Sequence, residues 1–495
     1  TGYSMRICIV HYHLQLGGVT RVIQHAFEAL RPRGVRLVVL SGEPPGIQMP
    51  ADLAVRVLPG LGYDERRAAC TPDELAADMV RAARDALGAA PDLWHVHNHS
   101  LGKNTALPAA LLRLARDGHR LLLQPHDFAE DGRPALYWRL RERLADGDIG
   151  RLSSLFYPLA PQVHYATLNR RDRDFLAAAG VPAAQLHALP NAVSVGGAPD
   201  SGTLEAADAP QRRADGQRLW LYPTRAIRRK NLGELLLWAA VAGEQDRFAA
   251  TQAPQNPQER PAYERWVALA RELTLPMTFA AGEGDVDFGA LIASSHALVS
   301  TSIAEGFGLA FLEPWLLRRP LAGRDLPEIT ADFVDAGVRL PGLYTRLEVP
   351  LAWLDRERLR AAFTTAAADR AKAYGRPAAD SAERAWQSAV NAAHIDFGRL
   401  DEPAQEVVIR RLRTEPDARS ALRPRALELA ATPALIESNR AVIAETYSVP
   451  GFGERLAAIY ATVAAATPSA TRAAAPGDTL LDACLAPARW SLLRS

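Results

Sequence analysis

The sequence predicts an α/β protein with two domains, each built around a buried parallel sheet, followed by a helical C-terminal extension. Short apolar runs alternate with helical patterns over residues 5–195 and again over residues 218–377. Between the two series, residues 196–217 contain few large apolar side chains, and from residue 378 the alternation stops. A chain of 495 residues also exceeds what one ordinary hydrophobic core supports.

The N-terminal series begins with a predicted strand, turn and helix. An apolar run at residues 7–10 ends at His11, Gly17 and Gly18 follow, and residues 19–27 place their apolar side chains on one helical face. Further apolar runs cover residues 35–40, 93–96 and 121–123, and the last two also end at polar residues. Uninterrupted apolar runs are typical of strands that are buried on both faces. Because ligands bind at the carboxyl ends of such strands, we expect a binding site there.

The C-terminal series repeats this pattern. Apolar runs cover residues 219–222, 277–281, 297–300 and 320–323, and a helical pattern covers residues 232–242. Residues 196–217 are rich in Gly, Ala, Asp and Ser, which predicts an interdomain linker whose hinge would open and close a central cleft. In the predicted C-terminal extension, residues 378–495, helical patterns continue to about residue 466, and we expect this extension to pack back on both domains. Residues 467–478 are predicted to be mobile because they are rich in Ala, Pro, Thr and Gly.

The composition excludes some partners and compartments. Lys and Arg together number 57 and Asp and Glu 56, which gives a net charge of +1. A protein without a strong overall field is not drawn to nucleic acid, and we expect at most peripheral contact with a membrane. The cysteines Cys8, Cys70 and Cys484 match no zinc-binding spacing and favour a reducing compartment. Since no uninterrupted run of about 18 apolar residues occurs either, the sequence predicts a cytoplasmic protein.

The strongest motif covers residues 304–313. It combines two carboxylates with a glycine-rich turn, and its members are Glu305, Gly306, Phe307, Gly308, Leu309 and Glu313. The glycines let the backbone approach a ligand closely, and the free amides at the start of a helix beginning near Leu309 suit a diphosphate. Glu305 could accept hydrogen bonds from sugar hydroxyls, and Glu313, two helical turns further on, from ribose hydroxyls. The alternative interpretation is a helix with an acidic first turn.

A basic motif follows the apolar run at residues 219–222. Arg225 and Lys230 leave the end of the same predicted strand, within a segment that also contains Arg228 and Arg229. Arginine offers a planar fork of donors and lysine a compact charge, so the pair suits a diphosphate whose negative charge grows as a glycosidic bond breaks. The alternative is a solvated basic turn.

Four stretches of the sequence resemble glycosyltransferase family 4 and its retaining relatives with the GT-B fold, which has two Rossmann-like domains. They occur in the family's order and are residues 17–22, residues 189–193, Arg225 with Lys230, and residues 305–313. The resemblance implies that Arg225 and Lys230 hold the donor diphosphate, Glu305 the donor sugar and Glu313 the ribose. It also implies that Gly17 and Gly18 form a loop near the donor phosphate and that Asn191 contributes to donor binding.

The sequence departs from the family pattern at three places. Asn231 stands where glycine is common, Pro314 stands where alanine is usual, and residues 324–326 replace the glycines usual before the segment Pro327-Glu328-Ile329. These departures concern which sugar and which nucleotide base the donor carries more than they concern the class of protein.

The acceptor side is expected in the N-terminal domain. His126 occupies the position where the family often has a histidine beside the donor sugar, and it could hydrogen-bond a sugar hydroxyl and orient the acceptor; the alternative is a satisfied core histidine. The further acceptor-side candidates are Asn98, His99, Lys103, Asn104 and Asp127. His95, His97 and His99 would share one strand face, but no partnered acid or cysteine supports a metal site. Asp285 and Asp287 are interpreted as part of a turn.

The predicted function is the transfer of a hexose, with retention, from a UDP- or GDP-linked sugar to a hydroxyl of an acceptor, which we expect to be small and soluble. The resemblance implies front-face displacement, in which the leaving diphosphate takes the acceptor proton. Since Arg225 and Lys230 would neutralise the diphosphate, neither a metal nor a cofactor is expected.

Two other classes of function stay open at this point. One is a nucleotide-sugar epimerase or a sugar phosphorylase on the same scaffold, because a fold does not decide the reaction. The other is a non-catalytic sugar-nucleotide-binding protein whose helical extension contacts a partner. The same extension leaves the formation of a homo-oligomer open.

Overall fold

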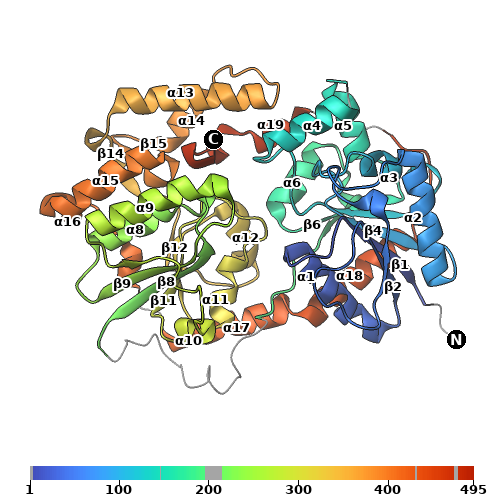
Figure 1. The fold of residues 1–495 in the computed structure, drawn as a ribbon, viewed down its shortest axis with the longest axis horizontal. Coiled ribbons are helices and arrows are strands. Elements are labelled where there is room, and N and C mark those ends of the chain that lie inside the picture. Colours follow the sequence, from blue (N-terminus) through green and yellow to red (C-terminus); the bar gives the residue numbers. More distant parts are fainter. Residues whose placement is uncertain (1–3, 145, 196–214, 430–431, 473–477, 495) are drawn as a thin grey trace. The chain divides into compact units, whose positions relative to one another are not determined.

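The computed structural model describes residues 4–144, 146–195, 215–429, 432–472 and 478–494 (Figure 1). The chain divides into two compact units. The N-terminal unit contains Thr1–Ala192 and Tyr447–Ala486, and the C-terminal unit contains Val193–Thr446 and Pro487–Ser495. The predicted α/β architecture with parallel sheets is confirmed in both units.

The N-terminal unit is built on a seven-stranded parallel sheet with the order β3-β2-β1-β4-β5-β6-β7. Its strands are β1 (Arg6–His11), β2 (Arg36–Ser41), β3 (Ala54–Val57), β4 (Leu93–His97), β5 (Leu121–Gln124), β6 (Val163–Thr167) and β7 (Leu186–Ala188). The apolar runs at residues 7–10, 35–40, 93–96 and 121–123 are therefore confirmed as strands. The strand order reverses between β1 and β4, and in open parallel sheets a ligand crevice lies outside the carboxyl ends at such a point.

Helices cover both faces of this sheet (Figure 1). They are α1 (Gly18–Leu30), α2 (Pro72–Leu87), α3 (Leu107–Arg116), α4 (Pro134–Leu144), α5 (Ile149–Phe156), α6 (Arg170–Ala178), α18 (Val449–Ala464) and α19 (Asp478–Cys484). The predicted helix at residues 19–27 is α1, and it shares a buried core with α18 and the β1 residues Ile7 and Ile9. The two helices approach closely, because a Cβ on Gly453 of α18 would lie 2.6 Å from the Cβ of Ala29 in α1.

The C-terminal unit repeats the same topology with the order β10-β9-β8-β11-β12-β13, again parallel throughout. Its strands are β8 (Arg218–Arg225), β9 (Asp246–Gln252), β10 (Met277–Thr278), β11 (Ala297–Ser300), β12 (Leu321–Arg324) and β13 (Leu343–Tyr344). The predicted run at residues 277–281 thus forms only a two-residue strand. The strand order reverses between β8 and β11, which places a second switch point at their carboxyl ends.

The helices of the C-terminal unit pack on this sheet and on each other (Figure 1). They are α8 (Leu232–Val241), α9 (Arg260–Glu272), α10 (Phe288–Ala293), α11 (Glu313–Leu316), α12 (Pro327–Asp335), α13 (Arg356–Ala373), α14 (Ser381–Ala389), α15 (Glu402–Thr414), α16 (Pro416–Ala421) and α17 (Pro433–Thr446). Every residue of α8 is buried, because the helix lies between the sheet and α15.

The expected helical extension, residues 378–495, is divided between the two units. Its first part, with α14 to α17, belongs to the C-terminal unit, and residues 447–486 belong to the N-terminal unit. It is also not wholly helical, because β15 (Val390–Asn391) and β16 (His394–Asp396) form a small antiparallel sheet with β14 (Glu348–Pro350). The physical reason is that α15 and α18 each carry an apolar face that must be covered by a core, and each covers a different one.

Two sequence predictions concern segments that the structure describes only in part. Residues 196–214 of the expected linker and residues 473–477 of the expected mobile segment lie outside the described residues. Arg472 pairs with Leu159 through hydrogen bonds of 2.7 and 3.0 Å in an isolated antiparallel bridge, so this part of the segment is ordered by the N-terminal unit.

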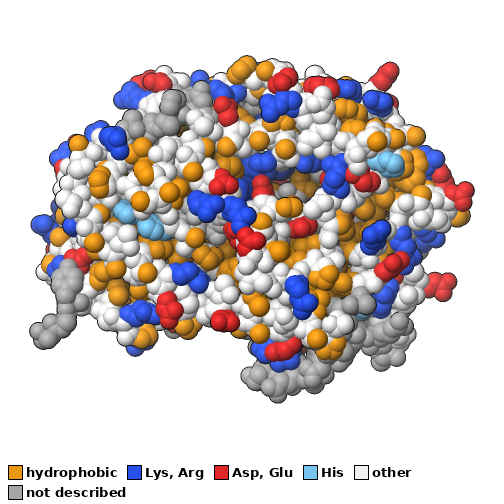
Figure 2. Space-filling view, turned by 180° about the vertical axis from the view of Figure 1, so that it is seen from behind, with side chains coloured by type: hydrophobic (Ala, Val, Ile, Leu, Met, Phe, Trp, Pro, Cys, Tyr) orange, Lys and Arg blue, Asp and Glu red, His pale blue; other side chains and the backbone are white. Residues whose placement is uncertain are grey.

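Charges are mixed over the surface. On the face drawn in Figure 2, Lys and Arg alternate with Asp and Glu over both units, and histidine contributes little. Within the residues that the structure describes, no helix is both long and apolar enough to cross a bilayer.

Candidate active site

The two switch points carry most of the predicted site residues. In the N-terminal unit, β1 and β4 end at His11 and His97. In the C-terminal unit, β8 ends at Arg225, and the chain after β11 runs into the turn that contains Glu305. Each sheet therefore presents a group of polar side chains at the edge where ligands bind.

The basic turn after β8 is held by the neighbouring strand end. Residues Arg228–Lys230 form a short 3-10 helix, and Asn231 has a left-handed φ of 53° before α8 begins. Asparagine tolerates this conformation, so Asn231 can adopt a backbone geometry that otherwise favours glycine. The Thr301 hydroxyl donates to the carbonyls of Lys230 and Asn231 at 3.0 Å each. The end of β11 thus fixes the position of Lys230.

Lys230 and Glu305 form an ion pair in the C-terminal unit. Their side chains are 14% and 10% exposed, and Arg229 also contacts the Glu305 carboxylate at 3.3 Å. Burial raises the pKa of Glu305, but Lys230 and Arg229 outweigh it, so this pKa lies below its ordinary value. Burial lowers the pKa of Lys230 by more than Glu305 raises it. The predicted phosphate-binding and sugar-binding residues therefore contact each other directly.

Arg225 lies at the end of the same strand but outside this pair. Its side chain is exposed, and it forms no ion pair with any residue in the described part of the chain. Arg229, which the sequence interpretation did not single out, takes the place beside Glu305 and also donates to the carbonyl of Ala304 at 2.6 Å. Its position next to Lys230 in a basic segment was the only signal for it.

Packing constrains the glycine-rich turn at Gly308 and Phe307. Gly308 has a φ of 95°, and a Cβ there would lie 2.6 Å from Ile329 Cγ2, so glycine is required by both backbone and packing. The Phe307 side chain packs on Phe333 with ring centroids 5.6 Å apart, which leaves only the Phe307 backbone for a ligand. Around Gly306, a Cβ would meet nothing within 4 Å.

The continuous helix expected from Leu309 through Glu313 is not formed. Leu309–Phe311 is a 3-10 turn, and Glu313 begins the separate four-residue helix α11. Pro314 accounts for the break, because it has no N–H to donate to the preceding turn and is tolerated only in the first turn of a helix. Glu313 is half-buried, at the start of a helix rather than two turns into one.

Histidines dominate the edge of the N-terminal unit. His97 Nδ1 lies 2.8 Å from His126 Nε2, and the two rings stack with centroids 5.1 Å apart. His11 lies beside His97, with ring centroids 6.2 Å apart. Burial lowers the pKa of His126 to about 4 and that of His11 to about 3, and it lowers the pKa of His97 as well. These imidazoles are therefore neutral at pH 7 and suited to hydrogen-bond hydroxyl groups.

Three acceptor-side candidates are occupied by the protein itself. The amide oxygen of Asn98 accepts hydrogen bonds from the backbone N–H groups of His126 and Asp127. Asn104 accepts from the N–H groups that begin α3 and donates to the carbonyls of Gly60 and Gly62 at 2.8 Å each. His99 Nε2 lies 2.7 Å from the carbonyl of Phe156. These contacts favour structural roles for Asn98, His99 and Asn104.

The remaining candidates are more accessible. Asp127 pairs with Arg133 at 2.8 Å while its side chain stays 39% exposed. Lys103 Nζ lies 5.1 Å from the centre of the Tyr63 ring. Gly17 and Gly18 are exposed, and a Cβ on either would meet nothing closer than 3.9 Å, so packing does not require glycine at either position. Asn191 is half-buried, and its Oδ1 is buried without a hydrogen-bond partner among the described residues.

The triad of strand histidines is divided among different contacts. His95 Nδ1 lies 2.8 Å from the Tyr460 hydroxyl, and His95 Nε2 lies 2.8 Å from Gln124 Oε1. Because β4 ends at His97 and Asn98 has a φ of 54°, His99 turns away from the other two. Among the residues described, no group of three or more His, Cys, Asp or Glu side chains is arranged to hold a metal ion.

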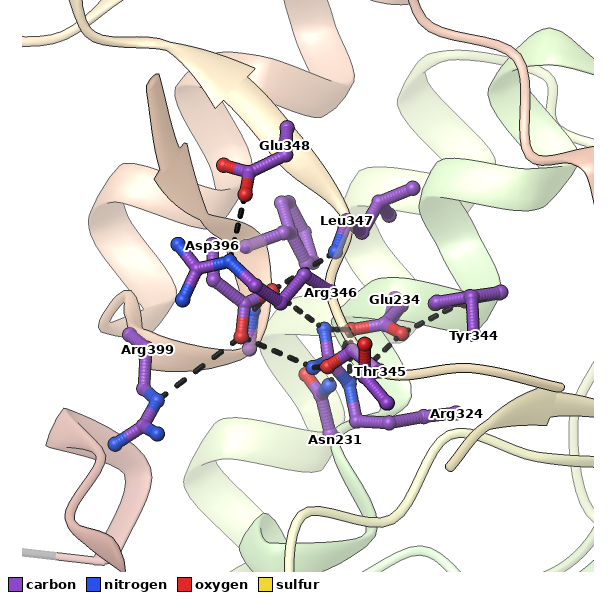
Figure 3. A network of polar contacts seen from close by, with 12 residues as sticks. Asn231, Glu234, Arg324, Tyr344, Thr345, Arg346, Leu347, Glu348, Asp396 and Arg399 are labelled. Atoms are coloured by element: carbon purple, nitrogen blue, oxygen red, sulfur yellow. Dashed lines mark hydrogen bonds and ion pairs between the residues drawn. The ribbon is translucent and has the colours of Figure 1, made fainter. Parts of the chain in front are cut away.

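Arg324 explains one departure from the family pattern (Figure 3). It lies at the end of β12, and its guanidinium is buried between two carboxylates. Its Nη2 lies 2.8 Å from Glu234 in α8 and 2.9 Å from Asp396 in β16. Tyr344 donates to Glu234 at 2.8 Å. This network attaches the small antiparallel sheet to the parallel sheet of the C-terminal unit.

Known proteins resemble the chain in sequence and in fold. The profile of the glycosyl transferase 4-like domain matches residues 17–192. Mannosylglucosyl-3-phosphoglycerate synthase of Petrotoga mobilis is 26% identical over 351 residues, and the match covers 66% of each of the two chains. Among solved structures, sucrose-phosphate synthase from Thermosynechococcus elongatus has a TM-score of 0.53 at 14% identity, over 92% of this chain and 98% of that one. HepE from Anabaena, in complex with UDP and glucose, has a TM-score of 0.51 at 13% identity with the same coverage.

The sheet topology, the polar groups at both switch points and these similarities define the class: the protein is a glycosyltransferase with the GT-B fold. Within that class, residues 17–192 resemble the glycosyl transferase 4-like domain.

Proposed function

We propose that the protein transfers a hexose, with retention of anomeric configuration, from a UDP- or GDP-linked sugar to a hydroxyl of a small acceptor. The observation that carries the proposal is the pairing of Lys230 with Glu305 at the switch point of the C-terminal unit, with Arg225 at the end of the same strand. The complex of HepE with UDP and glucose supports a nucleotide sugar as donor, and the name of the Petrotoga relative supports the formation of a glycoside.

The basic residues would hold the donor diphosphate. Lys230 is mostly buried and Arg225 exposed, so the first supplies a fixed charge and the second a movable fork. When a diphosphate binds Lys230, the ammonium group contacts both the diphosphate and Glu305. One oxygen of the Glu305 carboxylate is then free to accept a hydrogen bond from the sugar. Because these cations neutralise the charge that grows on the leaving diphosphate, the transfer needs no metal ion.

The N-terminal unit would bind the acceptor through neutral groups. His97 and His126 hydrogen-bond each other and are kept uncharged by burial, so they can orient a hydroxyl without attracting the donor phosphates. In the proposed step, the acceptor oxygen bonds to the anomeric carbon as the bond from that carbon to the diphosphate oxygen breaks. The acceptor proton leaves on the diphosphate, and the protein contributes position and electrostatics.

A transfer assay tests this proposal. The protein is incubated with UDP-glucose, UDP-galactose and GDP-mannose and a set of hydroxyl acceptors, and the anomeric configuration of any product is determined by NMR. We expect an α-linked product from an α-linked donor, unchanged turnover in EDTA, and a loss on the order of 10²-fold in Lys230→Ala. A β-linked product would contradict retention, and a loss of less than tenfold in Lys230→Ala would contradict the role of Lys230.

A further inference from the structure

A basic cluster surrounds Tyr63 in the N-terminal unit, next to the histidine edge. We define the Tyr63 cluster as His13, Tyr63, Arg66 and Lys103. Lys103 Nζ lies 5.1 Å and Arg66 Cζ 5.5 Å from the centre of the Tyr63 ring. The Tyr63 hydroxyl lies 3.0 Å from His13 Nε2. The segments that follow β3 and β4 thus bring two cations, Arg66 and Lys103, to one aromatic ring.

The ion pairs around this cluster leave an excess of positive charge. Three carboxylates lie in this region, and they pair with four arginines. The carboxylates are Glu43, Asp64 and Glu65, and the arginines are Arg66, Arg67, Arg139 and Arg143; Lys103 is the fifth basic side chain. In the described part of the chain Lys103 forms no ion pair, and Arg66 reaches only the Glu43 carboxylate, at 3.5 Å. The Tyr63 ring holds both cations at one place, and their charge is not fully neutralised by the neighbouring carboxylates, so Lys103 and Arg66 are placed to receive an anion.

The cluster continues inward to buried imidazoles with unused polar atoms. His13 lies beside His11, with ring centroids 5.2 Å apart, and His11 beside His97 at 6.2 Å. His11 Nδ1 and His97 Nε2 are buried and have no hydrogen-bond partner within the described residues. Buried polar atoms in native proteins are normally hydrogen-bonded, so these two nitrogens indicate a ligand with hydroxyl groups.

From the two cations and the two unpaired nitrogens, we propose that the acceptor is an anionic hydroxy compound. Its phosphate or carboxylate binds Lys103 and Arg66 at the Tyr63 ring, and its hydroxyls hydrogen-bond His11 and His97. The inference rests on the proposed transferase function and adds the chemical class of the acceptor. The anionic group takes no part in the transfer step, because it is bound away from the hydroxyl that reacts.

Binding measurements with two matched series test the proposal. The probes are 3-phosphoglycerate, glycerate and glycerol, and glucose 6-phosphate, glucuronate and glucose, each titrated by calorimetry in the presence of saturating UDP or GDP. The variants are Lys103→Gln and Arg66→Gln, and the control is Arg173→Gln, an exposed arginine of α6 paired with its neighbour Asp174. All are surface changes, and thermal unfolding verifies that each variant folds.

We expect an anionic probe to bind about tenfold or more tightly than its neutral counterpart. Lys103→Gln and Arg66→Gln are each expected to weaken binding of the anionic probe by about tenfold and to leave binding of the neutral probe unchanged. Arg173→Gln is expected to change the binding of neither probe. Comparison within each series separates a phosphate from a carboxylate as the recognised group.

Three results would overturn the inference. They are equal binding of anionic and neutral probes, absence of binding by every anionic probe, and loss of UDP or GDP binding in Lys103→Gln, which would assign the cluster to the donor. Failure of the proposed function is a separate outcome, because it appears as absence of nucleotide binding in the wild type, whether or not the anions bind.

Discussion

The two units have the same strand order but opposite chemistry at their switch points. In the C-terminal unit, Lys230 and Glu305 are both mostly buried and remain paired as ions. In the N-terminal unit, His11, His97 and His126 are buried and neutral because burial lowers the pKa of each. Ten of the twelve histidines of the chain lie within residues 1–192. Topology therefore places a site in both units, and the side chains assign charge to one and hydrogen bonding to the other.

The largest effect is expected from the buried charges that support the C-terminal unit. Arg324→Met leaves Glu234 and Asp396 buried without their cation, and the loss of unfolding free energy is expected to be about 3–5 kcal/mol. Urea unfolding measures it. Arg360→Ala serves as the control, because its pair with Glu383 is well exposed and contributes much less. Equal effects of the two changes would show that the network does not stabilise the unit.

Acid is expected to destabilise the N-terminal unit. Burial lowers the pKa of four histidines to about 3 or 4; they are His11, His95, His99 and His126. In the unfolded chain the same imidazoles have the ordinary histidine pKa of about 6.5, so below pH 6.5 the unfolded chain binds more protons than the folded unit. Their contribution is complete above about pH 6.5 and is lost as the pH decreases toward 4.

Two buried acids, fewer than the four histidines, have the opposite effect on stability. Burial raises the pKa of Glu130 to about 7 and that of Asp172 to about 6, so their contribution is lost as the pH rises. Between pH 4.5 and 6.5 the histidines prevail, at about 1.4 kcal/mol per pH unit for each net proton. Hydrogen exchange of peptides from β1, β4 and β5 measures the opening free energy. An opening free energy that increases on acidification in this range, after correction for the intrinsic pH dependence of exchange, would contradict the assignment of neutral imidazoles.

Glu305→Gln separates the two roles in the charged site. Without the carboxylate, Lys230 is released from its ion pair, so binding of UDP or GDP alone is expected to be unchanged or up to several-fold tighter. Binding of the nucleotide sugar is expected to weaken by about tenfold, because a charged acceptor of its hydroxyl hydrogen bonds is lost. Calorimetric titration measures both. Equal weakening of nucleotide and nucleotide sugar would assign Glu305 to the diphosphate site rather than to the sugar.

The smallest effect on stability is expected at the exposed glycines of the N-terminal unit. Gly17→Ala has open space and an extended φ of 174°, so the free energy of unfolding should change by less than about 0.5 kcal/mol. Transfer activity should decrease by about tenfold if a ligand approaches the backbone there. Gly308→Ala is the contrasting variant, because its φ of 95° and the 2.6 Å approach to Ile329 destabilise the folded unit. Full activity in Gly17→Ala would remove Gly17 from the site.

Much of the fold could be predicted because parallel strands leave a simple signature. The runs at residues 7–10, 93–96 and 297–300 are apolar on both faces, and each ends where polar residues begin. The sequence predicts that the C-terminal residues pack on both domains, but the apolar faces of α15 and α18 do not indicate which core each helix covers. The break before Glu313 follows from Pro314, which cannot donate a backbone hydrogen bond within a helix.

The site was predicted unevenly for a related reason. Lys230 and Glu305 were named because they follow strand ends, and strand ends meet at one edge of a sheet. Asn98 and Asn104 were named for the same reason, but their partners are backbone groups of distant loops, which sequence spacing does not show. The Tyr63 cluster was missed because residues 59–67 follow no recognisable strand and approach β4 only in the folded unit.

Thermal unfolding with a panel of nucleoside diphosphates and their sugars tests the central claim most directly, in the wild type and in Arg225→Ala and Glu305→Ala. A ligand that binds only the folded protein adds about 2.7 kcal/mol when present at about 100 times its Kd. We predict that one nucleotide sugar raises the Tm of the wild type and that Arg225→Ala abolishes this shift. Absence of a shift with every nucleotide and nucleotide sugar would contradict the proposed transfer from a nucleotide sugar.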